Sequence, residues 1–256
     1  MTRLLAIALT AGSLLAQTGF EAVSIRPGDP FTGARTIHGG PGSPDPGLVT
    51  MRNIDLFSLV AMAYDLHRYQ LSAPDWLNST RFDISARVPQ GINADRYRRM
   101  LQDLLTERFH LAVHHDRREM RIYDMTVAKD GLKMKKSPNQ SSGDDGVQPP
   151  PQPAVRPPGY HGAVVLRIPA LSMPRLAGYL SGFLDAPIED ATGLQGEYEI
   201  NLRTLATATS PEPLADGAPQ SIFDALPEQL GLHLAPRKSQ VDVLVVDRVD
   251  KSPTEN

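Results

Sequence analysis

The chain contains no cysteine among its 256 residues. This absence excludes disulfide bonds, thiolate metal ligands and a cysteine nucleophile. A strong charge of either sign is also missing, because the formal net charge is -3 and the pI is about 6.2. Such a balance gives no general attraction to nucleic acid or to an anionic membrane. The protein must therefore depend on a hydrophobic core, and its length allows one.

Several catalytic motifs are missing as well. We find no HExxH zinc motif, no SxxK motif and no glycine-rich nucleotide loop. The stretch GYLSG, residues 178–182, resembles a nucleophile elbow only loosely, because it lacks the GxSxG order and lies within a helical pattern. Packing of a helix through small residues is the other interpretation of Ser181. The sequence therefore predicts no catalytic residue, no metal ligand and no cofactor.

The first residues are typical of a secretory signal peptide. A basic start at Arg3 precedes an apolar run, LLAIALTAGSLLA, which ends in small residues at Ala16. We therefore expect a signal peptide over residues 1–16 and a mature protein that is periplasmic or secreted. The alternative is a buried helix at the start of a cytosolic domain. No second long apolar run follows, so we expect no transmembrane segment in the mature chain.

Proline and glycine divide the rest into two units. Residues 137–160, which include PPPQPAVRPPG, predict a linker between a first unit, 17–136, and a second unit, 161–256. Each unit shows the patterns of strand, helix, strand, strand, helix and hairpin in that order. In the first unit, the second helix is predicted over 96–109 with Asp95 as its cap. The predicted fold class is α+β with mainly antiparallel sheets.

The two units also resemble each other in sequence. When Glu107 is placed on Glu228, Phe109 aligns with Leu230 and Ile122 with Val243 without a gap. We interpret this match as an internal duplication. Chance similarity between two α+β segments is the alternative interpretation.

The stretch DATGLQGEYEINL, residues 190–202, raises the question of a substrate-handling loop. The favoured interpretation is a structural turn, in which Asp190 accepts from nearby backbone N–H groups while Gly193 and Gly196 adopt positive φ. The alternative is an aspartyl-phosphate loop. Ala191 stands where such a loop has lysine, which argues against it.

Histidines and aromatic residues supply the remaining site candidates. His114 and His115 point to opposite faces of a predicted strand and cannot share a metal without a bulge. Tyr64, Tyr69 and the only tryptophan, Trp76, are proposed to line one small-ligand groove. Burial of Trp76 against the first helix is the competing interpretation.

Several stretches carry a resemblance to a known family. In chain order they are FEAVSIRP, VTMRNIDLFSLVAMAYDLHRYQLSAPDWLNSTRFDISARV, LLTERFHLAVHHDRREMRIYDMTVAKDGLKMK, DATGLQGEYEINL and LPEQLGLHLAPRKSQVDVLVVDRVDKSPTEN. They resemble a soil-associated, exported bacterial family of unknown function. One departure, Ala73-Pro-Asp75 in place of a glycine-rich turn, affects only local shape. Related domains are attached to penicillin-sensor-type membrane metallopeptidases, which implies a sensory or binding role.

The sequence thus predicts a non-catalytic binding module of the cell envelope, for which the resemblance implies a sensory role. Its expected partner is an unidentified envelope protein or a small ligand. One alternative is a hydrolase of envelope polymer, in which Asp83, Asp190 and His114 meet in a cleft between the units. Another is a structural protein that assembles through its sheets.

Overall fold

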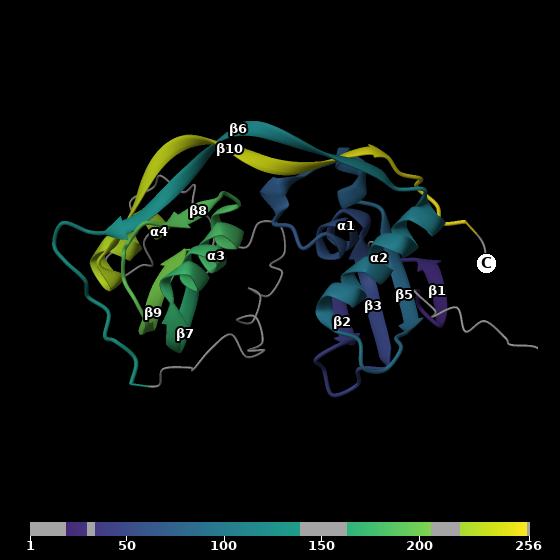
Figure 1. Cartoon of the computed structure of the whole chain (residues 1–256), viewed down its shortest axis with the longest axis horizontal. Helices are drawn as coiled ribbons and strands as arrows, with labels where there is room; N and C mark the ends of the chain where they lie inside the picture. The colour runs from purple at the N-terminus through teal and green to yellow at the C-terminus, as the bar shows by residue number, and fades with distance from the viewer. Residues whose placement is uncertain (1–18, 30–33, 139–162, 206–220, 255–256) are drawn as a thin grey trace, which may run out of the picture.

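The computed structural model describes residues 19–29, 34–138, 163–205 and 221–254. The predicted signal peptide and nearly all of the predicted linker lie outside these ranges. The described chain forms two lobes, which a long two-stranded ribbon connects (Figure 1). Helices and mainly antiparallel sheets occur in both lobes, so the predicted α+β class is confirmed.

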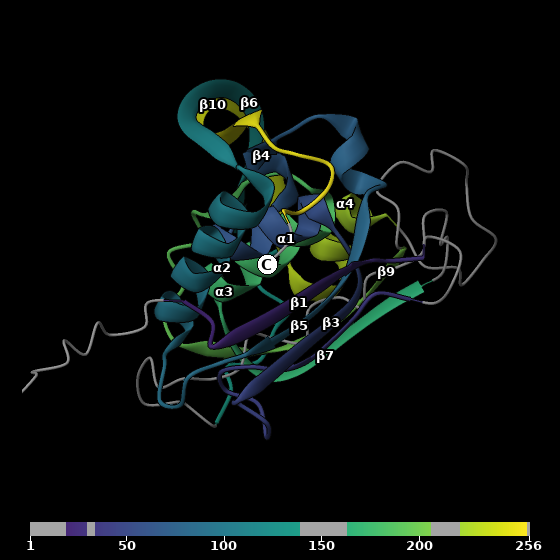
Figure 2. The same ribbon diagram turned by 90° about the vertical axis from the view of Figure 1, so that its right-hand side faces the viewer.

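The first lobe contains a four-stranded antiparallel sheet in the order β1-β5-β3-β2. Its strands are β1 (Ala22–Pro27), β2 (Thr36–Gly39), β3 (Leu48–Asp55) and β5 (Arg81–Arg87). Figure 2 shows helices α1 (Leu56–Ala63) and α2 (Ala94–Phe109) on one side of this sheet. Alternation along β5 explains why the helices cover one face of the sheet. Phe82, Ile84 and Ala86 are buried on that face, while Asp83, Ser85 and Arg87 are exposed on the other.

Local capping sets where the helices of this lobe begin. The Asp55 side chain accepts from the Ser58 N–H at 2.8 Å and starts α1. The cap predicted for α2 was wrong by two residues. Asn93 has extended backbone and accepts from the Arg96 N–H at 2.9 Å, so the helix begins at Ala94, and Asp95 lies within its first turn. Two short 3-10 turns, η1 (Arg68–Gln70) and η2 (Asp75–Asn78), connect the remaining segments.

The second lobe is built in the same order on a smaller scale. Its elements are β7 (Ala163–Ser172), α3 (Met173–Leu184), β8 (Ile188–Asp190), β9 (Glu197–Leu205), α4 (Ile222–Ala225) and the π-helical turn η3 (Leu226–Leu230). Strands β7 and β9 form a two-stranded antiparallel sheet. A bridge between Lys136 and Tyr198 covers only the start of the second edge of β9, and no described strand pairs with the second edge of β7.

The ribbon consists of β6 (Ala112–Val127) and β10 (Leu232–Arg248). The two strands pair antiparallel over almost their full lengths, from Leu232 opposite Val127 to Arg248 opposite Ala112. The hairpin predicted at the end of each unit was therefore wrong, since each segment is one continuous strand. The reason is local: the stretch HHDRREM in β6 contains no glycine, proline or asparagine to make a tight turn.

Each end of the ribbon joins a different lobe. The short strand β4 (Leu71–Ser72) of the first lobe pairs in parallel with β10, and β8 of the second lobe pairs in parallel with β6. Two separate cores result, one under each sheet. The β3–β5 and β7–β9 pairs also share a register shift at corresponding positions, Met51/Ile54 and Ile168/Leu171. These shared features are compatible with an internal duplication, which stays a prediction.

Candidate functional site

The three aromatic residues of the predicted groove have different neighbours. Tyr64 follows α1 and packs at the margin of the first core, where burial and the Asp103 carboxylate raise the pKa of its phenol. Trp76 lies in η2, partly buried against the same core, and the Lys251 Nζ stands 5.2 Å from its ring centroid. A groove that joins these two side chains with Tyr69 stays a prediction.

Tyr69 lies instead where the two lobes meet. Its ring stacks on His67 with centroids 5.3 Å apart, and the His67 ring lies beside Gly182 of α3. Burial raises the pKa of the Tyr69 phenol, a hydrogen bond with Ser181 lowers it, and the Asp185 carboxylate raises it. This aromatic pair thus packs one lobe against α3 of the other.

Ser181 is fully engaged in structural contacts. Its hydroxyl donates to the Ala177 carbonyl at 2.9 Å and accepts from the Ile188 N–H at 2.9 Å. The side chain is also buried. A nucleophilic serine needs an accessible hydroxyl beside a base, and this one instead holds the end of α3 to the start of β8.

The Asp190 segment forms a tight turn. The Asp190 carboxylate accepts from the Thr192 N–H at 2.9 Å and from the Thr192 hydroxyl at 2.7 Å, which is the geometry of an Asx turn. Gly193 and Gly196 have φ of 70° and 86°. Both acceptor bonds lie within the segment itself, and the chain then enters β9.

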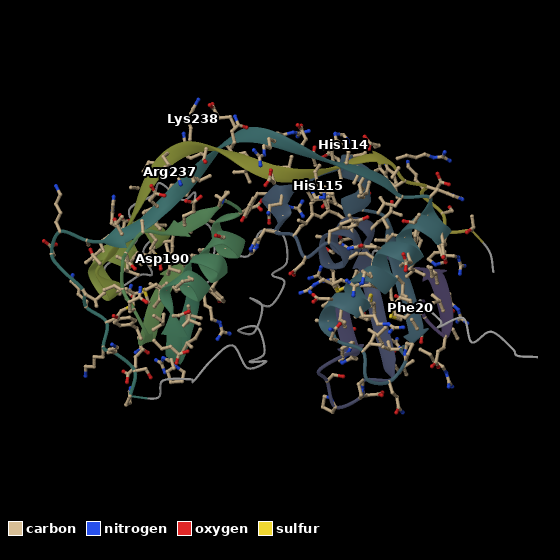
Figure 3. The ribbon with its side chains drawn as sticks, viewed as in Figure 1. Phe20, His114, His115, Asp190, Arg237 and Lys238 are labelled. Atoms are coloured by element: carbon tan, nitrogen blue, oxygen red, sulfur yellow. The ribbon has the colours of Figure 1, made fainter. Side chains whose placement is uncertain are left out.

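Two histidines, His114 of β6 and His110 at the end of α2, pair with acids near the end of β10. His114 Nδ1 lies 2.8 Å from Asp247, and His110 Nδ1 lies 2.8 Å from Asp250. Among the described residues, no three histidine or carboxylate side chains gather closely enough to hold a metal ion. Figure 3 shows His114 over the first lobe and Asp190 in the second, so the residues suggested for a hydrolase do not meet.

Each lobe of the described structure contains a hollow. The larger, of about 330 Å³, lies between the N-terminal segment and α2, near the Phe20 labelled in Figure 3. Phe20 meets Tyr97 edge to face with centroids 6.0 Å apart, and burial strongly raises the pKa of the Tyr97 phenol. The other is an apolar void of about 10 Å³ in the second core, about the size of one water.

The outer face of the four-stranded sheet, turned away from the helices, carries most of its exposed polar groups. We call it the arginine face, and it is defined by Arg26, Arg52, Arg81 and Arg87 with the residues between them. Register places Ser24, Ser85, Thr50 and His38 in one row across all four strands. Arg87 lies on one side of this row, and Arg26 and Arg52 lie on the other.

The charge of this face is mainly positive. Two acidic residues hold positions on this face, Asp83 opposite Arg26 and Asp55 opposite Arg81. The Asp83 carboxylate already accepts from the Asn53 N–H at 2.7 Å, and the Asp55 carboxylate caps α1. Arg81 donates to the Asn53 carbonyl at 3.1 Å. No ion pair joins Arg26, Arg52 or Arg87 to any acidic residue in the described part of the chain. Three exposed guanidinium groups therefore remain available to an anion.

Comparison with known proteins identifies the family. A family model described as "Protein of unknown function (DUF3738)" matches residues 57–249. The chain belongs to this family. No curated protein and no solved structure matches the chain. The matched region runs from α1 to the end of the ribbon. It includes β5, α2 and the second lobe, but not β1 to β3 of the first lobe.

The arginine face of this DUF3738 protein was missed in the sequence. The stretch RFDISAR in β5 does show the signal, because its alternate residues Arg81, Asp83, Ser85 and Arg87 are polar. Neither Arg26 nor Arg52 has a local pattern that places it beside these residues. Only the pairing of β1 and β3 with β5 brings the arginines onto one face.

Proposed function

We propose that this protein is an exported, non-catalytic binding module of the bacterial cell envelope, and that its arginine face binds an acidic polysaccharide. The observation that supports this proposal is the set of three exposed arginines, Arg26, Arg52 and Arg87, on one face of the sheet. None of them forms an ion pair with an acidic residue in the described part of the chain. Guanidinium groups bind carboxylates through paired, charge-assisted hydrogen bonds. Such a face stands out in a chain whose formal net charge is -3.

The groups between the arginines favour a sugar polymer among anionic ligands. Ser24, Ser85 and Thr50 offer hydroxyls that donate and accept hydrogen bonds, and His38 adds an imidazole at the end of the same row. Sugar hydroxyls need partners of both kinds. The face is part of a sheet rather than a pocket, so an extended polymer can lie across it with its carboxylates at the arginines on either side of the row.

Export is the second part of the proposal. The order of a basic start, an apolar run and a small-residue end over residues 1–16 supports it, and the absence of cysteine is compatible with it. No helix in the described part of the chain has the length and apolar character needed to span a bilayer. The resemblance to an exported family supports the same location, in the periplasm or outside the cell.

A catalytic function has weaker support. Strand register places Asp83 on the arginine face. Figure 3 shows Asp190 in the second lobe and His114 on the ribbon. General acid–base chemistry needs its groups within hydrogen-bond reach of one substrate. The non-catalytic proposal therefore accounts for the arrangement with fewer assumptions.

Binding to polygalacturonate, a carboxylated polysaccharide, tests the proposal by calorimetry or biolayer interferometry. We expect binding that weakens between about 25 and 250 mM NaCl, because salt screens exposed charges. The triple variant Arg26→Gln, Arg52→Gln and Arg87→Gln should lose at least about tenfold in affinity, since each charged hydrogen bond contributes about 1.5–3 kcal/mol.

A charge-matched control separates a specific face from general attraction. The variant Arg117→Gln, Arg203→Gln and Arg248→Gln removes three exposed arginines elsewhere. It should bind within about threefold of the natural protein, and neutral dextran should not bind to either. Equal losses in both triple variants, or no binding of the acidic polymer at low salt, would overturn the proposal.

A further inference from the structure

The two halves of the chain exchange strands. β6 belongs to the first half, yet its Met125 is fully buried in the core of the second lobe. β10 belongs to the second half, yet its Leu244 and Val246 are buried in the core of the first lobe. Figure 1 shows the teal and yellow strands crossing between the lobes side by side. Neither lobe is therefore complete without a strand from the other half.

Backbone and charged contacts connect the halves along the whole ribbon. Besides the His114–Asp247 pair, the ion pairs Arg117–Asp242, Glu119–Lys238 and Asp124–Arg237 cross between the strands at 2.8–2.9 Å. Beyond the ribbon, the chain end adds to the first lobe, because the N–H groups of Asp250 and Thr254 donate to the carbonyls of Phe109 and Arg108, each at 2.8 Å. The interface is thus continuous from the second core to α2.

This exchange has an approximately twofold arrangement. β10 pairs in parallel with β4 of the first half, and β6 pairs in parallel with β8 of the second. Leu244 stands opposite Leu71, and Tyr123 stands opposite Ile188. Each half thus gives a long strand to its partner and receives one in return. Nothing in this interface requires the two halves to come from the same molecule.

The connection between the halves is long relative to the span that it covers. The Ser137 N–H donates to the Glu197 carbonyl on one edge of β9, and Ala163 pairs with Leu205 on the other edge. Strand geometry separates these two points by about 28 Å, from the rise along β9 and two strand spacings. The intervening chain, residues 139–162, can reach about 80 Å when extended.

We propose that the halves are reciprocal binding partners: when the linker is too short to span one lobe, a second copy of this chain supplies the partner half, giving a dimer in which residues 19–138 of each copy pair with residues 163–254 of the other. The ribbon, both cores and the chain-end contacts are the same in the monomer and the dimer. Linker length then decides between them, because only a linker that can span the gap holds the chain's own partner half at high effective concentration. The proposal is independent of the ligand of the arginine face.

Shortening the linker tests this directly. Deletion of residues 141–160 leaves residues 139, 140, 161 and 162 in the linker, so the chain from Ser137 to Ala163 reaches at most about 22 Å and cannot span about 28 Å within one lobe. We expect a dimer of twice the monomer mass by light scattering, with amide protection in β6 and β10 as in the natural chain. A matched deletion of residues 145–154 leaves a reach of about 50 Å and should remain monomeric at micromolar concentration.

A folded monomer of the 141–160 deletion would overturn the proposal. Should that variant not fold, the full chain with a protease site inserted in residues 139–162 answers the same question. After cleavage, the halves should remain together. When equal amounts of unlabelled and isotope-labelled cleaved chain are mixed, unfolded and refolded, random pairing should give hybrid complexes in about half of the molecules. Separation of the cleaved halves, or refolding without hybrids, would refute the exchange.

Discussion

Replacing Leu244 with alanine tests whether the C-terminal half completes the N-terminal lobe. The Leu244 side chain is 1% exposed and packs in the same core as Leu59 and Phe82, far away in the sequence. Truncation of a buried leucine costs about 2–5 kcal/mol, from lost burial and the cavity left behind. We expect a loss near 3 kcal/mol, which raises the unfolded fraction by about two orders of magnitude.

Hydrogen exchange locates this loss, and urea titration measures it. In Leu244→Ala, amides of α1 and β3 should exchange faster, although these elements lie in the opposite half of the chain. The mirror variant Met125→Ala should instead accelerate exchange in α3 and β9, because Met125 is fully buried in the second core. Val165→Ala serves as the control, since Val165 is 55% exposed and its truncation should change stability by less than about 0.5 kcal/mol.

The reasoning fails if Leu244→Ala changes stability by less than about 1 kcal/mol, because that value lies below the range for a filled core site. It also fails if faster exchange is confined to the second lobe. Either result would mean that β10 does not complete the first core.

Three further predictions concern turns and tyrosines. Gly231→Ala should cost at least about 2 kcal/mol in urea unfolding, because φ is 69° there and a Cβ would lie 2.1 Å from the Gly131 carbonyl oxygen. Asp190→Ala should cost about 1–2 kcal/mol in the same assay but leave polygalacturonate affinity unchanged, whereas a ligand loop would lose affinity. Burial raises the pKa of Tyr69 and Tyr97 above 10.0 in the folded state. The stability that these two tyrosines contribute is therefore fully present below pH 10 and is lost as the pH rises further. The urea midpoint should decrease as the pH is raised above 10, and it should decrease less steeply in Tyr97→Phe.

Much of the local structure follows from the sequence alone. Alternation in RFDISAR predicts a half-buried strand, and the DATGLQG stretch predicts a turn before the strand that follows. The cap of α2 was placed two residues late because Asn93 and Asp95 are both good capping residues, and only the backbone conformation distinguishes them.

The candidate site was harder to predict because it depends on pairing between distant strands. Arg26, Arg52 and Arg87 are each unremarkable in their own segments. Register places them around one row of hydroxyls. For the predicted aromatic groove, closeness in the sequence says little about which neighbours each side chain has. Tyr69 and Trp76 are seven residues apart, yet Tyr69 contacts α3 and Trp76 contacts the chain end.

The sequence by itself determined the α+β class and many of the helices and strands, because periodicity, caps and turn residues act over a few neighbouring positions. Tertiary structure alone decided that β6 and β10 pair with each other and that each enters the opposite lobe. Backbone N–H and C=O groups are the same in every strand, so the local sequence carries little information about which edge they meet. The choice depends on which buried side chains, such as Met125 and Leu244, fill each core.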